Sequence, residues 1–517
     1  MGYEEIAHPK LVPANAGRLV LRWMHNIMHA GRHPTKALVG FFAAWSAFCL
    51  ILFVMPTPEG LTPAGQAVLA VMVWACVVWV TEAIPVGVTG LVIPMLLVMT
   101  NALKPFPAAA SGFTTPVVFL CLAAFIFAAI MQVAGLDQRI ALSMLHRLKV
   151  KTVNGVIWAM FAVNMVLSLI IPAANARAAT LLPVVNGITR LFGDSERERA
   201  AKKAIVIQTL VYGSMISGMC IMTAHLPNLV LVDMFEKHGF KISYFEWFML
   251  EWPNLGMFVL TQWWVQYYFK TRNVGISGGF EAVQHQYNDL PQTNRTEWLV
   301  LAVLGLLAAL WVSESWHKIP SHNAALIAIA VLFIPGLLPF KWQQIQERTI
   351  WGTILLLAGA LSLSNAMSKS GLALWVADFI HPLAENHPWW MVLLILMVGT
   401  HIIRLGLLSN IAAVTMLAPV LMPLGEKLGL HPVAFTMLVA DTDTFAYILP
   451  TQITAAVIAY SSGTFSMADY AKVGWVSVLI AIAYGICVMA PWMAFMGIPV
   501  WDPTAPWPFT TVPVLVK

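Results

Sequence analysis

Charged residues are scarce in this sequence of 517 residues. Asp, Glu, Lys and Arg make up 10% of it and hydrophobic residues 59%, whereas an ordinary soluble domain carries about 25% charged residues. A water-soluble fold has no use for so much apolar surface, but a helical bundle in lipid does. Residues 37–55 carry no charge, and at about 1.5 Å per residue they are long enough to cross a bilayer. The composition therefore predicts an all-α protein that spans the membrane many times.

Several chemical motifs are missing as well. No His-Glu-x-x-His sequence marks an intramembrane zinc protease, and no Walker sequence marks an ATP-driven pump. The five cysteines all lie in apolar stretches without metal-ligand spacing, so we interpret them as small packing residues. These absences predict that the chain is not an enzyme, and they leave transport as the expected activity.

The distribution of basic residues predicts the orientation of the chain. They gather in the N-terminal segment and in a loop near residue 150, as Lys10, Arg18, Arg22, Arg32, Lys36, Arg139, Arg147, Lys149 and Lys151. The tail after Ile498 is nearly uncharged. The positive-inside rule then places the N-terminus in the cytoplasm and the C-terminus on the periplasmic or external side of the cell inner membrane. The small net charge of +5 gives no sign of nucleic-acid binding.

The chain divides into two halves. Residues 1–36 are expected to form a cytoplasmic lead-in, either an amphipathic helix in the membrane interface or a disordered basic arm. A first half over 37–270 and a second half over 297–517 are separated by a polar linker at 271–296. We expect about 11 transmembrane helices in total, with some apolar stretches forming half-spans or hairpins because proline and polar residues interrupt them.

The two halves repeat each other at a single offset of about 236 positions. The coinciding residues pair as Ala124 with Ala360, Met131 with Met367, Gly135 with Gly371, Leu136 with Leu372, Ala141 with Ala377, Leu181 with Leu417, Pro183 with Pro419 and Val184 with Val420. A repeat of this size predicts two structurally similar halves. Inverted repeats are the arrangement that alternating-access transporters use.

Each half contains a short apolar segment interrupted by small polar residues, Ile171–Pro183 in the first and Leu407–Pro419 in the second. Non-helical backbone survives at membrane depth only where it lines a protein cavity. Its free N–H groups and the positive ends of helices attract anions, and unwound carbonyl groups attract sodium. We therefore predict two re-entrant helical hairpins, near 155–190 and 390–425. The alternative is tight packing of small residues between helices.

Several motifs together resemble the divalent anion/sodium symporter family, which transports di- and tricarboxylates and sulfate. They are Thr81-Glu82-Ala83-Ile84-Pro85, the two interrupted segments, Thr223-Ala224-His225-Leu226-Pro227-Asn228, Leu449-Pro450-Thr451-Gln452 and Met496-Gly497-Ile498. The resemblance covers nearly the whole chain. It implies a homodimer whose protomers each have a scaffold domain and a transport domain that moves like an elevator. It also implies that substrate carboxylates meet the hairpin tips, with sodium bound beside them.

The sequence departs from this family at both tips. Where the family carries Ser-Asn-Thr, the first tip has Ala173, Ala174 and Asn175, and the second has Ser409, Asn410 and Ile411. Side-chain oxygens are lost, which puts coupling to sodium in doubt. Arg177, close to the first tip, is expected either to pair a substrate carboxylate, to replace a cation electrostatically, or to extend toward the cytoplasm.

The resemblance implies substrate contacts at the two tips and in the segments downstream of them. The predicted substrate-binding residues are Ala174, Asn175, Arg177, Thr180, Thr223, Pro227, Asn228, Ser409, Asn410, Ile411, Thr415, Thr451 and Gln452. Candidate ion-coupling residues are His225, Arg404, Asp441 and Asp443. Intramembrane acids are functional by default, although the two aspartates alternatively cap a broken helix near water. Sodium is the candidate coupling ion, near Ala173, Asn175, Ser409 and Asn410, and no other cofactor is expected.

These observations predict a secondary active transporter of small organic anions such as succinate, malate, citrate or tartrate. The expected mechanism is elevator-type alternating access, coupled to Na⁺ or to exchange for protons or a counter-anion. The alternatives are a transporter of sulfate, organosulfonates or other inorganic anions, and a related cation/proton antiporter. The expected partners are the substrate anion, the lipid bilayer and a second copy of the chain.

Overall fold

A computed structural model describes residues 34–148, 151–272, 274–275, 279–407 and 409–509, and every regular element in these ranges is helical. The predicted all-α class is confirmed. Most of the predicted lead-in, residues 1–33, and the last eight residues lie outside the described part of the chain.

The helices that precede the predicted linker alternate with short turns. They are α2 (Pro34–Cys49), α3 (Pro63–Thr81), α4 (Val86–Met99), α5 (Phe106–Ala109), α6 (Pro116–Ala134), α7 (Leu136–Leu148), α8 (Val153–Ser168), α9 (Ala174–Thr189), α10 (Glu196–Val206), α11 (Gly213–Cys220), α12 (Leu226–Lys237), α13 (Tyr244–Glu251) and α14 (Leu255–Phe269). Short 3₁₀ and π segments connect several of them: η1 (Leu50–Val54), η2 (Ser111–Thr114), η3 (Ile207–Tyr212), η4 (Met222–Ala224) and η5 (Trp252–Asn254).

The remaining helices lie within the predicted linker and after it. They are α15 (Gly279–Asn288), α16 (Arg295–Val312), α17 (Glu314–His317), α18 (Ser321–Leu332), α19 (Trp342–Arg348), α20 (Trp351–Lys369), α21 (Leu372–Ala384), α22 (Trp389–Arg404), α23 (Asn410–Lys427), α24 (Pro432–Thr444), α25 (Thr454–Tyr460), α26 (Met467–Tyr484) and α27 (Ala490–Phe495). The short segments here are η6 (Pro450–Gln452) and η7 (Gly485–Met489).

Local sequence signals set many helix ends. Thr62 caps α3 by accepting a hydrogen bond from the Gly65 N–H at 2.9 Å, and Thr152 caps α8 in the same way. Gly135 ends α6 with φ +72°, a left-handed conformation that glycine adopts without a steric penalty. Its partner in the sequence repeat, Gly371, has φ +80° at the matching place after α20.

The repeat found in the sequence extends to the helix boundaries. The first residues of α8 and α22, Val153 and Trp389, are 236 positions apart, and so are their last residues, Ser168 and Arg404. The starts of α7 and α21, and of α9 and α23, differ by the same number. The common offset means that the two halves have the same order of helices over these elements, while their inverted orientation stays a prediction.

Seven helices in the described residues are long and apolar enough to cross a membrane, or eight when the bent pair α21 and α22 is counted as one span. The helix axis changes direction by 120° between the two members of that pair. Further apolar helices, among them α4, α8 and α18, are shorter. The chain is thus a multi-pass membrane protein, and the expected number of about 11 spans stays a prediction. The exposed cysteines Cys49 and Cys487 correct the expectation that all five cysteines pack inside the protein.

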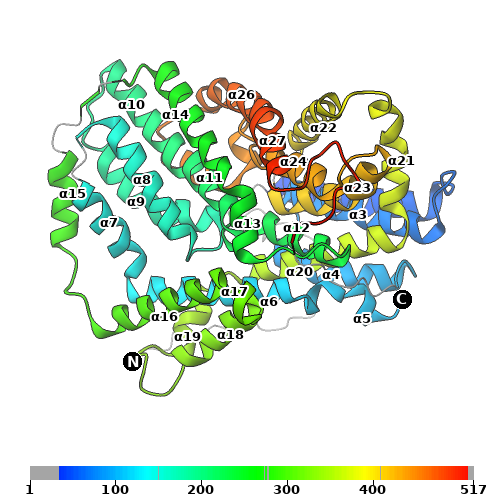
Figure 1. The fold of residues 1–517 in the computed structure, drawn as a ribbon, viewed down its shortest axis with the longest axis horizontal. Coiled ribbons are helices and arrows are strands. Elements are labelled where there is room, and N and C mark those ends of the chain that lie inside the picture. Colours follow the sequence, from blue (N-terminus) through cyan, green and yellow to red (C-terminus); the bar gives the residue numbers. More distant parts are fainter. Residues whose placement is uncertain (1–33, 149–150, 273, 276–278, 408, 510–517) are drawn as a thin grey trace, which may run out of the picture.

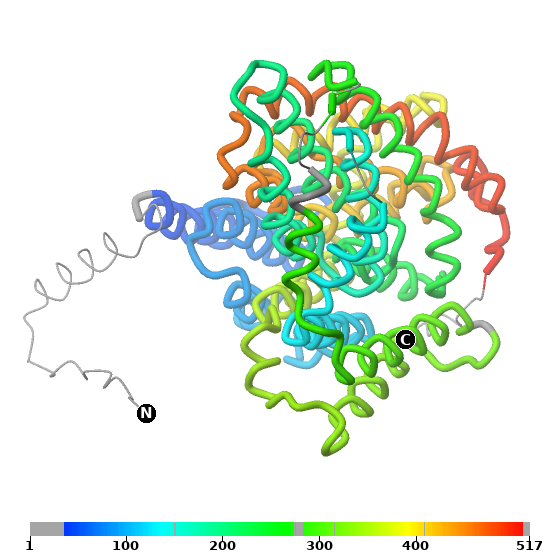
Figure 2. Tube along the Cα trace, turned by 90° about the vertical axis from the view of Figure 1, so that its left-hand side faces the viewer, coloured from blue at the N-terminus to red at the C-terminus, as the bar shows by residue number. Residues whose placement is uncertain are grey.

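The two repeated helix groups lie at opposite ends of the molecule. Figure 1 shows α7 to α10 at one end of the long axis and α21 to α23 with α3 at the other. Along the lower edge of this view, α18 and α19 pack against α6. Figure 2, turned by 90°, places the blue helices α2 and α3 and the red C-terminal segment on opposite sides of the body. Helices from both halves therefore meet in the middle of the molecule.

Glycines allow α4 and α20 to pack at very short range. A Cβ on Gly359 of α20 would lie 2.3 Å from the carbonyl oxygen of Gly90 of α4, whereas a Cβ on Gly399 of α22 would meet nothing within 4 Å. We expect Gly359→Ala to lower the free energy of unfolding by about 1–3 kcal/mol, as overpacking does. Gly399→Ala, the matched control, is expected to be neutral or mildly stabilising. Thermal unfolding of both purified variants measures the difference, and equal melting temperatures would contradict the packing described.

Candidate functional site

A cavity of about 270 Å³ lies where four helices begin. Its wall contains the first residues of α9, α12, α23 and α25, with Trp79 and Glu82 from the end of α3 and Thr353 from α20 on another side. The four helix starts contribute residues 173–175, 225–227, 409–411 and 453–455. Two of these starts belong to the first half of the chain and two to the second, so the cavity lies between the repeats.

The chain breaks in the same way before α9 and before α23. Ala173, which precedes α9, has φ −131° and ψ 128°, and Ser409, which precedes α23, has φ −131° and ψ 121°. Pro172 favours the extended conformation just before the first of these starts. The Ser409 hydroxyl accepts a hydrogen bond from the Ala412 N–H at 3.4 Å. Two interrupted segments that are related by the repeat thus present equivalent helix starts to one cavity.

The starts of α12 and α25 form a second matched pair. Each helix follows a single 3₁₀ turn, η4 or η6, and the residue between them is extended: His225 has φ −142° and ψ 122°, and Ile453 has φ −134° and ψ 125°. The Asn228 side chain holds the first of these breaks by donating to the carbonyl groups of Gly218, Met219 and Ile221 at 3.1–3.2 Å.

The helix starts make their part of the cavity suited to an anion, although the lining also includes the carboxylate of Glu82. The first N–H groups of a helix have no partner within the helix, and the helix dipole makes this end positive. Three helices of substantial length, α9, α12 and α23, begin here. The polar side chains of Asn175, His225 and Asn410 also line the cavity, and Asn410 donates to Nε2 of His225 at 3.3 Å. Helix starts gathered in this way bind carboxylate, sulfate or phosphate groups.

Two fully buried arginines lie behind this wall and do not line the cavity. Arg177 donates to backbone carbonyl groups at the breaks of the first half, and Arg404 does so in the second. Arg404 also donates to Oδ1 of Asn410, and its Nε lies 3.5 Å from Oδ2 of Asp443. Of the two candidate ion-coupling aspartates, Asp443 therefore lies beside Arg404.

Asp441 lies beside Glu251 of α13, a residue that the sequence analysis did not select. Both are buried, and their carboxyl groups are within hydrogen-bonding reach of each other. The Asn254 side chain donates to Oε2 of Glu251 at 2.7 Å. Two carboxylates this close in an apolar interior repel each other when both are ionised. The only sequence signal for Glu251 was a single acid in a mostly apolar stretch.

The structure brings most predicted tip residues together at the cavity. Its lining includes Ala173, Ala174, Asn175, His225, Pro227, Ser409, Asn410 and Ile411. The cavity also has lining residues that sequence reasoning did not select, among them Trp79, Val86, Leu356 and Thr454, and Glu82, which was part of a recognised motif without a predicted site role.

The predicted threonines and Gln452 lie outside the cavity lining. Thr180 hydrogen-bonds Asp137 of α7, and the Thr223 hydroxyl lies 2.9 Å from the hydroxyl of Tyr244. Thr415 is buried one turn into α23, and Thr451 is exposed. Gln452 supports the second break, because its side chain accepts from the Leu449 N–H at 2.7 Å and donates to the Arg404 carbonyl at 2.9 Å. Substrate contact by these residues stays a prediction.

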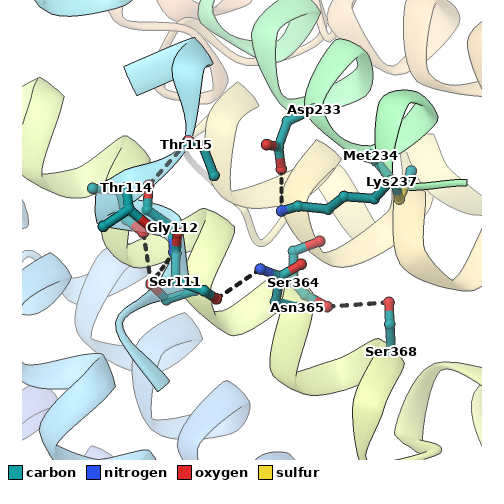
Figure 3. Close-up of polar contacts among 12 residues, drawn as sticks. Ser111, Gly112, Thr114, Thr115, Asp233, Met234, Lys237, Ser364, Asn365 and Ser368 are labelled. Atoms are coloured by element: carbon teal, nitrogen blue, oxygen red, sulfur yellow. Dashed lines mark hydrogen bonds and ion pairs between the residues drawn. The ribbon is translucent and has the colours of Figure 1, made fainter. Parts of the chain in front are cut away.

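Polar side chains of α12 and α20 face each other at the end of α12 that lies away from the cavity. Figure 3 shows Asp233 and Lys237 of α12, joined by an ion pair of 2.5 Å, facing Ser364 and Asn365 of α20. Asn365 donates to the Ser111 hydroxyl of η2 at 2.7 Å. Both α12 and α20 also contribute residues to the lining of the cavity.

Helix breaks from two repeats around one cavity, in a multi-pass membrane protein, are typical of the class of secondary transporters. The chain belongs to the family of the sodium:sulfate symporter transmembrane region, whose model matches residues 36–498. The resemblance drawn from the motifs is thereby confirmed. The family is one of sodium-coupled transporters, so the expectations of a transporter instead of an enzyme, and of sodium as the coupling ion at the level of the family, are confirmed too.

Known relatives extend over nearly the whole chain. A protein of Cupriavidus necator described as a membrane protein is 29% identical over 480 residues, which are 89% of this chain and 93% of the relative. The sodium-dependent dicarboxylate transporter SdcS of Staphylococcus saprophyticus is 26% identical over 490 residues, 90% of this chain and 93% of that protein.

Two solved structures share the fold. The YdaH transporter of Alcanivorax borkumensis superposes with a TM-score of 0.52 and 15% identity, over 84% of this chain and 99% of its own. MtrF of Neisseria gonorrhoeae, described among antimetabolite efflux pumps, gives a TM-score of 0.56 and 12% identity over 94% of this chain and 100% of its own.

Proposed function

We propose that this chain is a secondary active transporter of small organic anions with two or three carboxylates, such as succinate, malate, citrate or tartrate. One observation carries the proposal: equivalent helix starts from the two repeats, at Ala173 and Ser409, line the same cavity. Each start offers unpaired N–H groups and a positive dipole end. A dicarboxylate has two separated charges and can place one at each start.

The size of the cavity supports a small substrate. Pockets for drug-sized ligands hold roughly 300–1,000 Å³, and this one holds about 270 Å³. Asn175 and Asn410 of the lining can donate to carboxylate oxygens, and apolar lining side chains such as Leu356 and Ile453 suit a short carbon chain. The name of the relative SdcS, a sodium-dependent dicarboxylate transporter, favours the same substrate class.

Transport by this chain follows an elevator mechanism in our proposal. The hairpins α8–α9 and α22–α23 belong to a transport domain that carries the cavity between the two faces of the membrane, while a scaffold domain anchors a homodimer. The chain lies in the inner membrane with its N-terminus in the cytoplasm and its C-terminus outside. Uptake is coupled to Na⁺, to protons or to a counter-anion.

Uptake of labelled succinate into proteoliposomes tests this function. Vesicles with purified protein are loaded with unlabelled succinate or left empty, and Na⁺ and proton gradients are imposed separately. We expect saturable uptake under at least one condition, with competition by malate and little competition by lactate, which has one carboxylate. The family's description favours sulfate as the second candidate substrate. Uptake of sulfate without uptake of any dicarboxylate would overturn the proposal.

A further inference from the structure

The guanidinium group of Arg177 fills the helix breaks of the first half. Its Nη1 donates to the carbonyl oxygens of Ile171 at 2.7 Å and Ala224 at 2.9 Å, and its Nη2 donates to that of Ser214 at 2.6 Å. A Cβ on Gly218 would lie 2.6 Å from Nη2. The absence of a side chain at this glycine therefore leaves room for the guanidinium, which is completely buried.

Arg404 does the same in the second half. Its Nη1 donates to the carbonyl oxygen of Leu407 at 3.0 Å, and its Nη2 donates to that of Gln452 at 3.0 Å and to Oδ1 of Asn410. The guanidinium is completely buried. Arg177 thus bonds to the breaks before α9 and α12, and Arg404 bonds to the breaks before α23 and α25. We call α9 and α23 the tip helices.

The two pairs of carbonyl groups are structurally equivalent. Ile171 and Leu407 each lie two residues before the N-cap of a tip helix, α9 or α23. Ala224 and Gln452 each end a single 3₁₀ turn directly before α12 or α25. The arginines themselves are not equivalent in sequence, since Arg177 lies in the first turns of α9 and Arg404 ends α22. Two positions that the repeat does not relate thus place a guanidinium against equivalent carbonyl groups in both halves.

Carbonyl groups released by broken helices are the ligands that hold Na⁺ in transporters of this kind. Here their oxygens already accept hydrogen bonds from a group that stays protonated at any physiological pH. A sodium ion would have to displace those donors and lie against a buried positive charge. The residues present therefore do not fit Na⁺ at either break.

The geometry points to a division of roles that rests on the proposed function: Arg177 and Arg404 occupy the places that two coupling cations would take, and this chain transports its dianion without sodium. Among the described residues Arg404 has an acidic partner, Asp443, whereas Arg177 forms no ion pair. The charge of Arg177 therefore favours an anion without any bound cation. A bound cation can leave with the substrate, but a side chain cannot, so a sodium gradient has no ion through which to drive uptake.

Transport and stability measurements test this inference separately. In proteoliposomes loaded with unlabelled succinate, we expect uptake of labelled succinate to be equal in sodium and in choline at the same ionic strength. Empty vesicles with an inward sodium gradient should take up no more succinate than empty vesicles in choline. Sodium-driven uptake into empty vesicles would overturn the inference while leaving the proposed function intact.

The stability measurement does not require knowledge of the substrate. A ligand that binds the native state raises the melting temperature, so sodium and choline should give wild-type protein the same melting temperature. A sodium-specific increase would overturn the inference even if no dianion were transported. In Arg177→Ala the carbonyl groups of Ile171 and Ala224 become free, and we expect sodium to stabilise this variant more than choline does. Arg197→Ala, on an exposed face of α10, is the matched control and should show no such preference.

Discussion

Replacing Asn410 with alanine is expected to lower succinate uptake by about 10- to 100-fold while folded protein stays in the membrane. Asn410 lines the cavity, accepts a hydrogen bond from Arg404 and donates one to His225. Hydrogen bonds to charged groups contribute about 1.5–3 kcal/mol, and every 1.4 kcal/mol changes an affinity about tenfold. Loss of the side chain removes the proposed substrate contact and a hydrogen-bond acceptor of the Arg404 guanidinium. Initial uptake rates in proteoliposomes, normalised to the amount of monodisperse protein, measure the effect.

The chain offers a control for this substitution. Asn288, at the end of α15, is exposed and away from the cavity, so Asn288→Ala makes the same chemical change without touching the site. Its uptake should equal that of the wild type. Wild-type uptake in Asn410→Ala as well would remove Asn410, and with it the second tip, from the proposed site.

Replacing Arg404 with methionine is expected to lower the free energy of unfolding by about 3–5 kcal/mol, the cost of leaving one member of a buried ion pair without its partner. Arg404 and Asp443 are both completely buried at 3.5 Å, and neither carboxylate oxygen of Asp443 has another hydrogen-bond partner among the described residues. Methionine keeps much of the volume but leaves the aspartate charge uncompensated. Thermal unfolding in detergent should show a large decrease in melting temperature, and little folded protein should be recovered.

A second substitution separates the charge effect from the loss of packing. Asp443→Asn added to Arg404→Met removes the unpaired charge, so the double variant should recover part of the lost stability. Arg197→Met on the surface of α10 controls for the same change outside the pair. If the double variant is as unstable as the sum of both single variants, the two side chains do not interact, and the ion pair described here does not contribute to the fold.

Much of the architecture could be predicted because it depends on local patterns. The offset of 236 positions, found from coinciding glycine, proline and methionine residues, also relates the ends of α8 and α22. Both interrupted segments begin a helix after an extended N-cap, at Ala173 and at Ser409. The tip residues therefore came together at the cavity as the repeat suggested.

Contacts between distant segments could not be predicted in this way. The equivalence of Arg177 and Arg404 depends on where two different helices deliver a guanidinium, and an alignment of the repeats places neither arginine on the other. Glu251 of α13 and Asp441 of α24 are 190 positions apart, so no local pattern relates them. Thr451 illustrates the opposite case: it lies next to Gln452 in a recognised motif, yet its side chain is exposed.

Equilibrium binding of labelled succinate to the purified protein tests the dianion site without a gradient or an assumed coupling ion. We expect saturable binding that unlabelled malate displaces, that lactate does not displace, and that is strongly reduced in Asn410→Ala but not in Asn288→Ala. Binding of equal strength in both variants, or no binding of any dicarboxylate to folded wild-type protein, would contradict the assignment of this cavity as the dianion site.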